Sequence, residues 1–320
     1  LNNQVAELEV ATSENSIQES IAQIYIQILY AAESVRVNEN TLQVSIAQRD
    51  RGQELLNAGS IAKSDFAQLE AQVSTDRYQL VTAQATLQDY KLQLKQLLEL
   101  DGENEMNIYL PALSDENVLS PLPAKRDVYV SALALRPEIE ASKLNVNASE
   151  LGIDIAKSGY LPTVSLSAGI GTNHTSGSDF TFSEQVKNGW NNSIGLSVSV
   201  PIFNNRQTKS AVQKAKLQYE TSMLSLLDEQ KALYKTIEGL WLDANSAQQR
   251  YAAANEKLKS TQISYNLISE QFNLGMKNTV ELLTEKNNLL QAQQEQLQAK
   301  YMAILNTQLL KFYQGDKLAL

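Results

Sequence analysis

The 320-residue sequence has no cysteine and one histidine, which excludes disulfides, thiol nucleophiles and Cys/His zinc sites within it. It also has no run of about 18 apolar residues, as a transmembrane helix would require. The net charge of −9 argues against a nucleic-acid partner. No Walker motif, nucleophile–base set or metal-ligand cluster is recognisable, so we predict neither an enzyme nor a cofactor or metal site.

Proline is scarce too, and the abundance of Ala, Leu, Gln, Ser and Asn favours long helices that pack through small side chains. Apolar residues of 206–272 recur at alternating intervals of three and four, which predicts a coiled-coil seam. The seam, with one irregular step, consists of Val212, Ala215, Tyr219, Met223, Leu226, Gln230, Leu233, Ile237, Leu240, Ala244, Ala247, Tyr251, Ala254, Leu258, Thr261, Tyr265, Ile268 and Phe272, of which only Gln230 and Thr261 are polar. Such a helix spans roughly 100 Å, so it belongs to a rod or a tube.

The rest of the chain is mostly helical by the same criteria. We predict helices over 1–56, 62–98, 137–158 and 278–313, with a short one near 127–135. The resulting regions are a first helical hairpin (1–100), an irregular connector (101–136), a helix (137–159), a strand region (160–204), a second helical hairpin (205–314) and a tail (315–320). Gly59 and Gly275 follow the first helix of each hairpin, where glycine suits a left-handed turn.

Two short runs, 162–170 and 193–202, alternate apolar with small polar residues, and this period of two predicts a strand hairpin around a loop at 172–191. One face carries Val164, Leu166, Ala168, Ile170, Ile194, Leu196, Val198, Val200 and Ile202. The other face is almost entirely Ser, Thr and Gly. Strands of about 9–11 residues with these two faces suit a membrane β-barrel. A half-buried hairpin in a soluble α+β domain is the alternative interpretation.

The chain also repeats itself at a shift of 216 residues, which places Asn57–Gly59 on Asn273–Gly275 and Asp65 on Glu281. Helix, glycine turn and helix therefore occur twice. Only the second copy is preceded by a helix and a strand hairpin, so we expect the native protein to have a further N-terminal helix and hairpin. A duplicated spectrin-like rod is the alternative.

Several motifs, in this order and with this repeat, resemble the TolC-type outer-membrane efflux protein family. The motifs are Arg136–Ile139, Ala156–Pro162, Val200–Phe203 and Phe272–Leu283. The resemblance covers essentially the whole chain, without the family's first helix and first β-hairpin. It implies a mainly α fold, in which coiled-coil helical hairpins build an α-barrel and the β-hairpin contributes to a trimeric transmembrane β-barrel.

The resemblance also implies a location and partners. The protein would be a homotrimer in the outer membrane of a Gram-negative cell, with helices that extend through the periplasm. It would be a passive efflux or type I secretion conduit that meets a periplasmic adaptor (membrane fusion protein) and, indirectly, an inner-membrane pump. The lipid-facing strand residues would be Val164, Leu166, Ile194, Leu196, Val198 and Val200.

The family's functional positions fall on the two glycine turns. By position, Gly59, Ser60, Leu274, Gly275 and Met276 would dock the adaptor. The resemblance implies that Lys277 meets Ser64 and Asp65 to close the tunnel and that Glu281 forms an acidic constriction. Coiled-coil pairs would untwist or splay at the turns to open it. The family's second acidic position falls on Thr284, so a second acidic ring is not expected here.

Simpler interpretations exist for several of these residues. Lys277 and Glu281 are four positions apart and can simply pair with each other. The turn glycines can be plain helix caps, and Asp65 an ordinary first-turn carboxylate. His174 fits a solvated loop residue. For the protein as a whole, the alternative function is a soluble periplasmic coiled-coil adaptor or scaffold.

Overall fold

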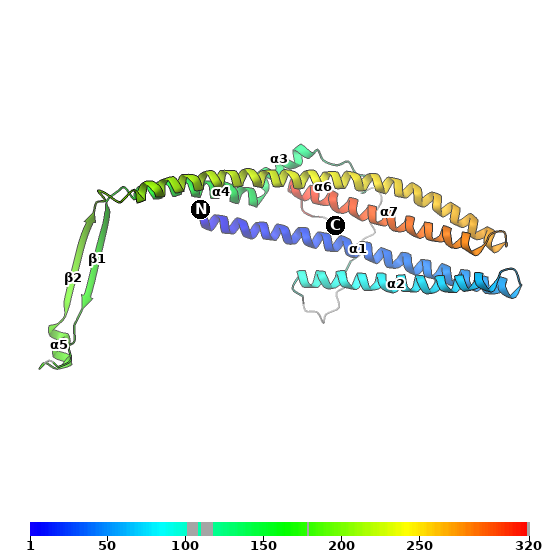
Figure 1. Cartoon of the computed structure of the whole chain (residues 1–320), viewed down its shortest axis with the longest axis horizontal. Helices are drawn as coiled ribbons and strands as arrows, with labels where there is room; N and C mark the ends of the chain where they lie inside the picture. The colour runs from blue at the N-terminus through cyan, green and yellow to red at the C-terminus, as the bar shows by residue number, and fades with distance from the viewer. Residues whose placement is uncertain (101–107, 110–117, 178, 319–320) are drawn as a thin grey trace. The chain divides into compact units, whose positions relative to one another are not determined.

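The computed structural model describes residues 1–100, 108–109, 118–177 and 179–318 (Figure 1). The elements are α1 (Asn2–Asn57), α2 (Lys63–Leu97), α3 (Lys125–Leu135), α4 (Pro137–Ser158), β1 (Thr163–Gly171), α5 (Phe182–Asn188), β2 (Asn191–Ser199), α6 (Gln207–Asn273) and α7 (Thr279–Gln314). They divide into two compact units, one of residues 1–6 and 141–228 and the other of residues 7–140 and 229–320. No helix within the described ranges combines the length and apolar composition needed to cross a bilayer.

The larger unit is built on the two helical hairpins, α1–α2 and α6–α7. Its core follows the predicted seam, because Leu233, Ile237, Ala244, Ala247 and Tyr251 of α6 are all buried. One cluster joins α1, α6 and α7 through residues such as Ile26, Tyr251 and Ile304. The alternating spacing of three and four thus identified the packed face of α6 correctly from Leu233 onward, whereas Met223 of the predicted seam is 49% exposed.

The described part of the connector packs onto the same unit. Helix α3 buries Val128 and Ala132 against Leu310 and Tyr313 of α7. The stretch before α3 has little secondary structure, and α6 satisfies part of its backbone. Gln248 of α6 donates hydrogen bonds to two of its carbonyls, at 2.9 and 2.8 Å, and Trp241 donates to a third at 3.1 Å. The predicted connector residues 101–107 and 110–117 lie outside the described part.

The smaller unit contains the strand hairpin, in which β1 and β2 pair antiparallel. Apolar residues face one another across the strands, with Val164 opposite Val198 and Leu166 opposite Leu196. Both strands are exposed at every residue, so nothing in the described part of the chain covers either face. Pro162 precedes β1, and Pro201 follows shortly after β2. Proline has no backbone N–H to donate to a neighbouring strand, so its place outside the paired residues is expected.

The structure corrects the predicted loop at 172–191, which contains the short helix α5. Thr181 and Glu184 form a capping box at its start, a signal that is visible in the sequence as Thr-x-x-Glu. The second strand is also shifted from the prediction. It begins at Asn191 and ends at Ser199, so Val200 lies just beyond the strand.

Candidate functional site at the helical turns

The turns α1–α2 and α6–α7 have the same backbone design. Gly59 and Gly275 both adopt left-handed conformations, with φ of 72° and 74°. In each turn the glycine N–H donates to the carbonyl three residues back, at 2.9 Å, and the next N–H donates to the carbonyl five residues back, at 2.8 Å. This is the Schellman motif, which satisfies the last free carbonyls of a helix. A side chain at either glycine would meet open space, so the φ angle is the reason for glycine.

The two turns present different side chains to solvent. The second turn exposes 74% of Leu274 and 70% of Met276. In the first turn, residues 57–60 are exposed and consist of Asn, Ala, Gly and Ser. Exposed apolar side chains on a tight, capped turn are candidates for contact with another protein, because burying them removes apolar surface from water. The residues predicted for adaptor docking are therefore accessible.

Beyond the second turn, the start of α7 is held by a capping box. Asn278 accepts a hydrogen bond from the Glu281 N–H at 2.9 Å, and Glu281 accepts one from the Asn278 N–H at 3.2 Å. The second carboxylate oxygen of Glu281 accepts from Lys277 at 2.5 Å. The pKa of Glu281 lies below its ordinary value, chiefly because of the Lys277 hydrogen bond and next because of the Asn278 N–H. Glu281 is thus ionised and locally paired.

The corresponding position in the first turn is Asp65, which accepts from the N–H of Ala62 at 3.2 Å. Ser64 beside it is exposed. Within this single chain, the structure therefore brings Lys277 to Glu281 and leaves Asp65 capping its own helix. Contact of Lys277 with Ser64 and Asp65 stays a prediction for an assembly of several chains.

A contact between the two turns was not found by sequence analysis. Four buried residues, one from each helix, form a cluster that we call the tip cluster: Leu55, Leu69, Phe272 and Leu282. Next to it, Arg51 donates a hydrogen bond to the carbonyl of Asn273 at 3.1 Å. The two residues are 222 positions apart, and no local pattern could have paired them. The two turns of one chain are consequently joined.

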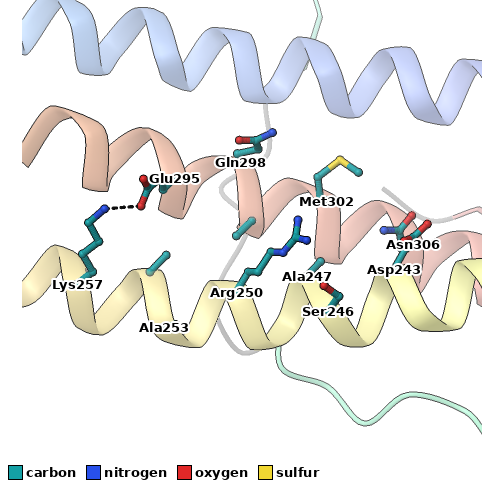
Figure 2. Close-up of a pocket in the computed structure, with 12 residues that line it drawn as sticks. Asp243, Ser246, Ala247, Arg250, Ala253, Lys257, Glu295, Gln298, Met302 and Asn306 are labelled. Atoms are coloured by element: carbon teal, nitrogen blue, oxygen red, sulfur yellow. Dashed lines mark hydrogen bonds and ion pairs between the residues drawn. The ribbon is translucent and has the colours of Figure 1, made fainter. Parts of the chain in front are cut away.

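Farther along α6 and α7 lies a groove of about 520 Å³ (Figure 2). Its lining combines small residues such as Ala247 and Ala254 with the polar groups Asp243, Arg250 and Asn306. One end carries an ion pair between Lys257 and Glu295, at 2.7 Å. Across the described residues, no group of three or more His, Cys, Asp or Glu side chains is placed to hold a metal ion.

The predicted lipid-facing strand residues form an exposed apolar row. Val164 and Leu166 of β1 lie beside Val198 and Leu196 of β2, and Ile194 continues the row. Each of these side chains is more than half exposed. A single hairpin buries none of this row, and the residues that the structure describes do not cover it.

Comparison with known proteins identifies the family. The sequence profile described as Outer membrane efflux protein matches residues 128–315, more than half of the chain. The chain belongs to the outer membrane efflux protein family. Outer membrane efflux protein BepC of Brucella suis biovar 1 (strain 1330) is 24% identical over 294 residues, which cover 91% of this chain and 61% of BepC. Outer membrane protein TolC of Escherichia coli (strain K12) is 24% identical over 316 residues, covering 94% of this chain and 62% of TolC.

This member of the outer membrane efflux protein family spans about three fifths of the length of those two relatives. The solved structure of the outer-membrane channel OprN has a TM-score of 0.80 at 19% identity, and the match covers 97% of this chain and 68% of that one. The likeness shows a shared fold. The predicted family and the predicted combination of long helical hairpins with a β-hairpin are confirmed.

Proposed function

We propose that the protein is a subunit of a passive outer-membrane channel that serves a tripartite efflux or type I secretion system. The observation that carries this proposal is the β1–β2 hairpin, whose apolar row is bare in a chain otherwise made of long helical hairpins. Unpaired strand edges are not tolerated in hydrocarbon, so strands of other segments or chains must close a barrel around a lumen. The serine face, including Ser165 and Ser197, would then line that wet lumen.

A homotrimer is the assembly that the family resemblance implies. The larger unit, with its long helical hairpins, would supply the periplasmic tunnel. The outer-membrane location is supported by the family and by the names of its relatives. The energy for transport would come from an inner-membrane pump, because a conduit of this kind does no chemistry of its own.

The glycine turns would be the docking site for a periplasmic adaptor. Leu274 and Met276 would supply the apolar contact, with Gly59 and Ser60 beside it in the assembled tunnel. Lys277 and Glu281 would lie at the tunnel entrance, and a ring of Glu281 carboxylates from several chains would favour cations there. Docking would compete with whatever contacts hold the entrance closed.

Extraction from outer membranes tests the location. The full-length protein should resist extraction by high salt and alkaline carbonate and should dissolve only in detergent. Release by salt or carbonate would instead favour the soluble adaptor or scaffold.

An export assay tests the docking site. Leu274→Asp should lower export of a tripartite-pump substrate by about tenfold or more, while the trimer persists on native gels, because a buried apolar contact gains an unpaired charge. The matched control is Leu267→Asp, an exposed leucine of α6 outside the turn, which should export normally. Normal export by Leu274→Asp would contradict docking at this turn.

A further inference from the structure

Another groove lies at the end of the strand hairpin, beside the short helix α5. It measures about 440 Å³ and is lined by Phe182, Ser183, Val186, Lys187 and Trp190. Phe182 and Val186 are one helical turn apart on α5, and Trp190 lines the same groove from the residue just before β2. Phe182 is 65% exposed and Trp190 59%, so this apolar lining is open to whatever surrounds the hairpin.

The loop around α5 is held in one shape by Gln185. The side-chain oxygen of Gln185 accepts a hydrogen bond from the Thr175 N–H at 2.8 Å, and its amide nitrogen donates to the Phe180 carbonyl, also at 2.8 Å. The His174 ring meets the Phe182 ring edge-on, with 5.1 Å between their centres. The groove is therefore preformed, and Phe182 has a fixed neighbour on the side of the loop.

The strand register places α5 on the apolar side of the hairpin. Gly171 is opposite Asn191, so the next facing positions are Thr172 and Trp190. Both are even-numbered, as are all residues of the exposed apolar row, and the period of two puts their side chains on that side. The Thr172 hydroxyl donates a hydrogen bond to the Val186 carbonyl of α5 at 3.0 Å. The groove thus continues the apolar row at its end.

The aromatic side chains along the hairpin are spaced like the two faces of a bilayer. Helices α4 and α6 join the hairpin at one end, and α5 lies at the other (Figure 1). Each strand has nine residues, which rise roughly 23 Å at about 3.4 Å per residue and a tilt of about 40°. Outer-membrane barrels expose an apolar band of about 25 Å between aromatic girdles. Tyr160 and Phe203 are exposed at the helix end, as Phe182 and Trp190 are at the other, so α5 lies at the far boundary of the band.

Lys187 adds a positive charge to the groove. It lies in the last turn of α5. Glu184, one turn earlier, directs its carboxylate to Thr181 instead, where it accepts from the N–H at 3.0 Å and from the hydroxyl at 2.8 Å. A basic side chain beside an apolar groove, at the level of the lipid headgroups, suits an anionic lipid that carries phosphate.

We propose that the groove beside α5 binds an acyl chain of an anionic, phosphate-bearing lipid of the outer leaflet, with the lipid phosphate at Lys187. Phe182, Val186 and Trp190 contact the acyl chain. This inference rests on the proposed channel function, which places the apolar row in lipid and α5 on the side away from the periplasmic helices. A lipid bound here seats the loop on the membrane surface.

Quenching of Trp190 fluorescence by brominated lipids tests the proposal. Trp241→Phe leaves Trp190 as the only tryptophan of the 320 residues, and any further tryptophan of the full-length protein is also replaced by Phe. The channel is reconstituted in phosphatidylcholine vesicles, with bromine on the acyl chains of either added phosphatidylglycerol or the phosphatidylcholine itself. Phosphatidylglycerol should quench with about fivefold higher affinity, the effect of one lysine near anionic headgroups. Unbrominated lipid A with two phosphates, an outer-leaflet lipid, should displace it.

Two substitutions separate the phosphate contact from the acyl-chain contact. Lys187→Gln should bring the affinities for the two lipids within about twofold of each other, because the charge that distinguishes them is gone. Val186→Asp should weaken quenching by both lipids about tenfold or more, because it places a charge where the acyl chain binds. The matched control is Lys214→Gln, an exposed lysine of α6 outside the groove, which should keep the preference for phosphatidylglycerol.

Equal quenching of Trp190 by the two lipids, without any substitution in the groove, would overturn the proposal. So would the absence of quenching, which would mean that another protein segment or a second copy of the chain covers the groove. A reporter in the apolar row, Leu166→Trp with Trp190→Phe, distinguishes this failure from that of the channel function. Quenching at 166 without quenching at 190 overturns only the lipid site, whereas no quenching at 166 counts against a lipid-facing barrel.

Discussion

Replacing Arg136 should destabilise the protein, although nothing in the sequence around it indicates that its charge is buried. It lies between α3 and α4, and its side chain is only 7% exposed. The guanidinium pairs with Glu19 of α1 at 2.6 Å and approaches Glu138 at 3.7 Å. It also stacks over Tyr313 of α7, with its central carbon 3.7 Å from the ring centre. One side chain thus joins the connector to α1 and α7.

Two substitutions separate the contributions of charge and shape. Arg136→Met leaves Glu19 unpaired, and we expect a loss of about 3 kcal/mol. This is the lower end for a broken buried pair, since the Glu19 side chain is still 23% exposed and solvent screens part of the loss. Arg136→Lys keeps the positive charge but loses the planar guanidinium group and its stacking on Tyr313. We expect this substitution to lower the free energy of unfolding by about 1–2 kcal/mol.

Guanidinium denaturation of the detergent-solubilised protein would measure the effect. A Trp190→Phe background leaves Trp241 as the only tryptophan, and Trp241 packs beside the cluster of Val128 and Leu310. The unfolding midpoint should fall for Arg136→Lys and fall further for Arg136→Met. Lys157→Met, which removes an exposed ion pair, should shift it little. A wild-type midpoint for Arg136→Met would refute the anchoring role.

Three further predictions follow from single groups. Gly275→Ala should cost about 1 kcal/mol in thermal melts because of its positive φ, whereas Gly152→Ala within α4 should stabilise slightly. Burial raises the pKa of Tyr313 to about 12, so its own contribution to stability should be full below pH 10 and lost between pH 10 and 12. Denaturant unfolding over this pH range should show a larger loss of stability in the wild type than in Tyr313→Phe. Because the pKa of Glu281 is lowered, its contribution to folding stability is present above about pH 4.5 and is lost as the pH falls through the lowered value. Lys277→Met removes the first cause of this shift, so an NMR titration of the Glu281 carboxyl group should return its pKa toward 4.5.

The parts of the fold that could be predicted are those that depend on neighbours in the sequence. The spacing of apolar residues on α6 identified its buried face, and the glycines at 59 and 275 marked both turns. The period of two identified both strands. Helix α5 was missed although Thr181 and Glu184 carry the signal of its cap, because a seven-residue helix has almost no periodicity to detect.

The contacts that fix the larger unit could not be predicted in this way. Asp76 and Lys286 look like ordinary solvated helix charges, because their partners are 210 positions apart. Arg136 was noted only as part of a family motif, and nothing nearby in the sequence indicates its stacking on Tyr313. For Lys277, local pairing with Glu281 and a contact across the turns were equally open in the sequence, and the single chain forms the local pair.

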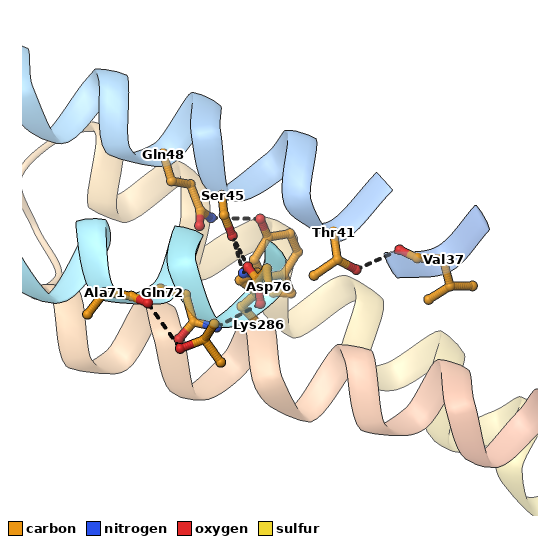
Figure 3. Close-up of polar contacts among 10 residues, drawn as sticks. Val37, Thr41, Ser45, Gln48, Ala71, Gln72, Asp76 and Lys286 are labelled. Atoms are coloured by element: carbon orange, nitrogen blue, oxygen red, sulfur yellow. Dashed lines mark hydrogen bonds and ion pairs between the residues drawn. The ribbon is translucent and has the colours of Figure 1, made fainter. Parts of the chain in front are cut away.

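Two ion pairs, of which Lys286–Asp76 is fully buried (Figure 3) and Arg136–Glu19 partly so, oppose a change of register in this unit, whose seams are repetitive. Apolar seams with spacings of three and four still bury apolar surface when one helix slides past another by a turn. Ion pairs tolerate such sliding less well, because it would separate Arg136 from Glu19 and Lys286 from Asp76. Each separated charge would then be left without its partner inside the protein. Arg136 and Lys286 contact α1 at Glu19 and Ser45, which are 26 residues apart, or roughly 39 Å along the helix. Two fixed points so far apart oppose tilting of the helices as well as sliding.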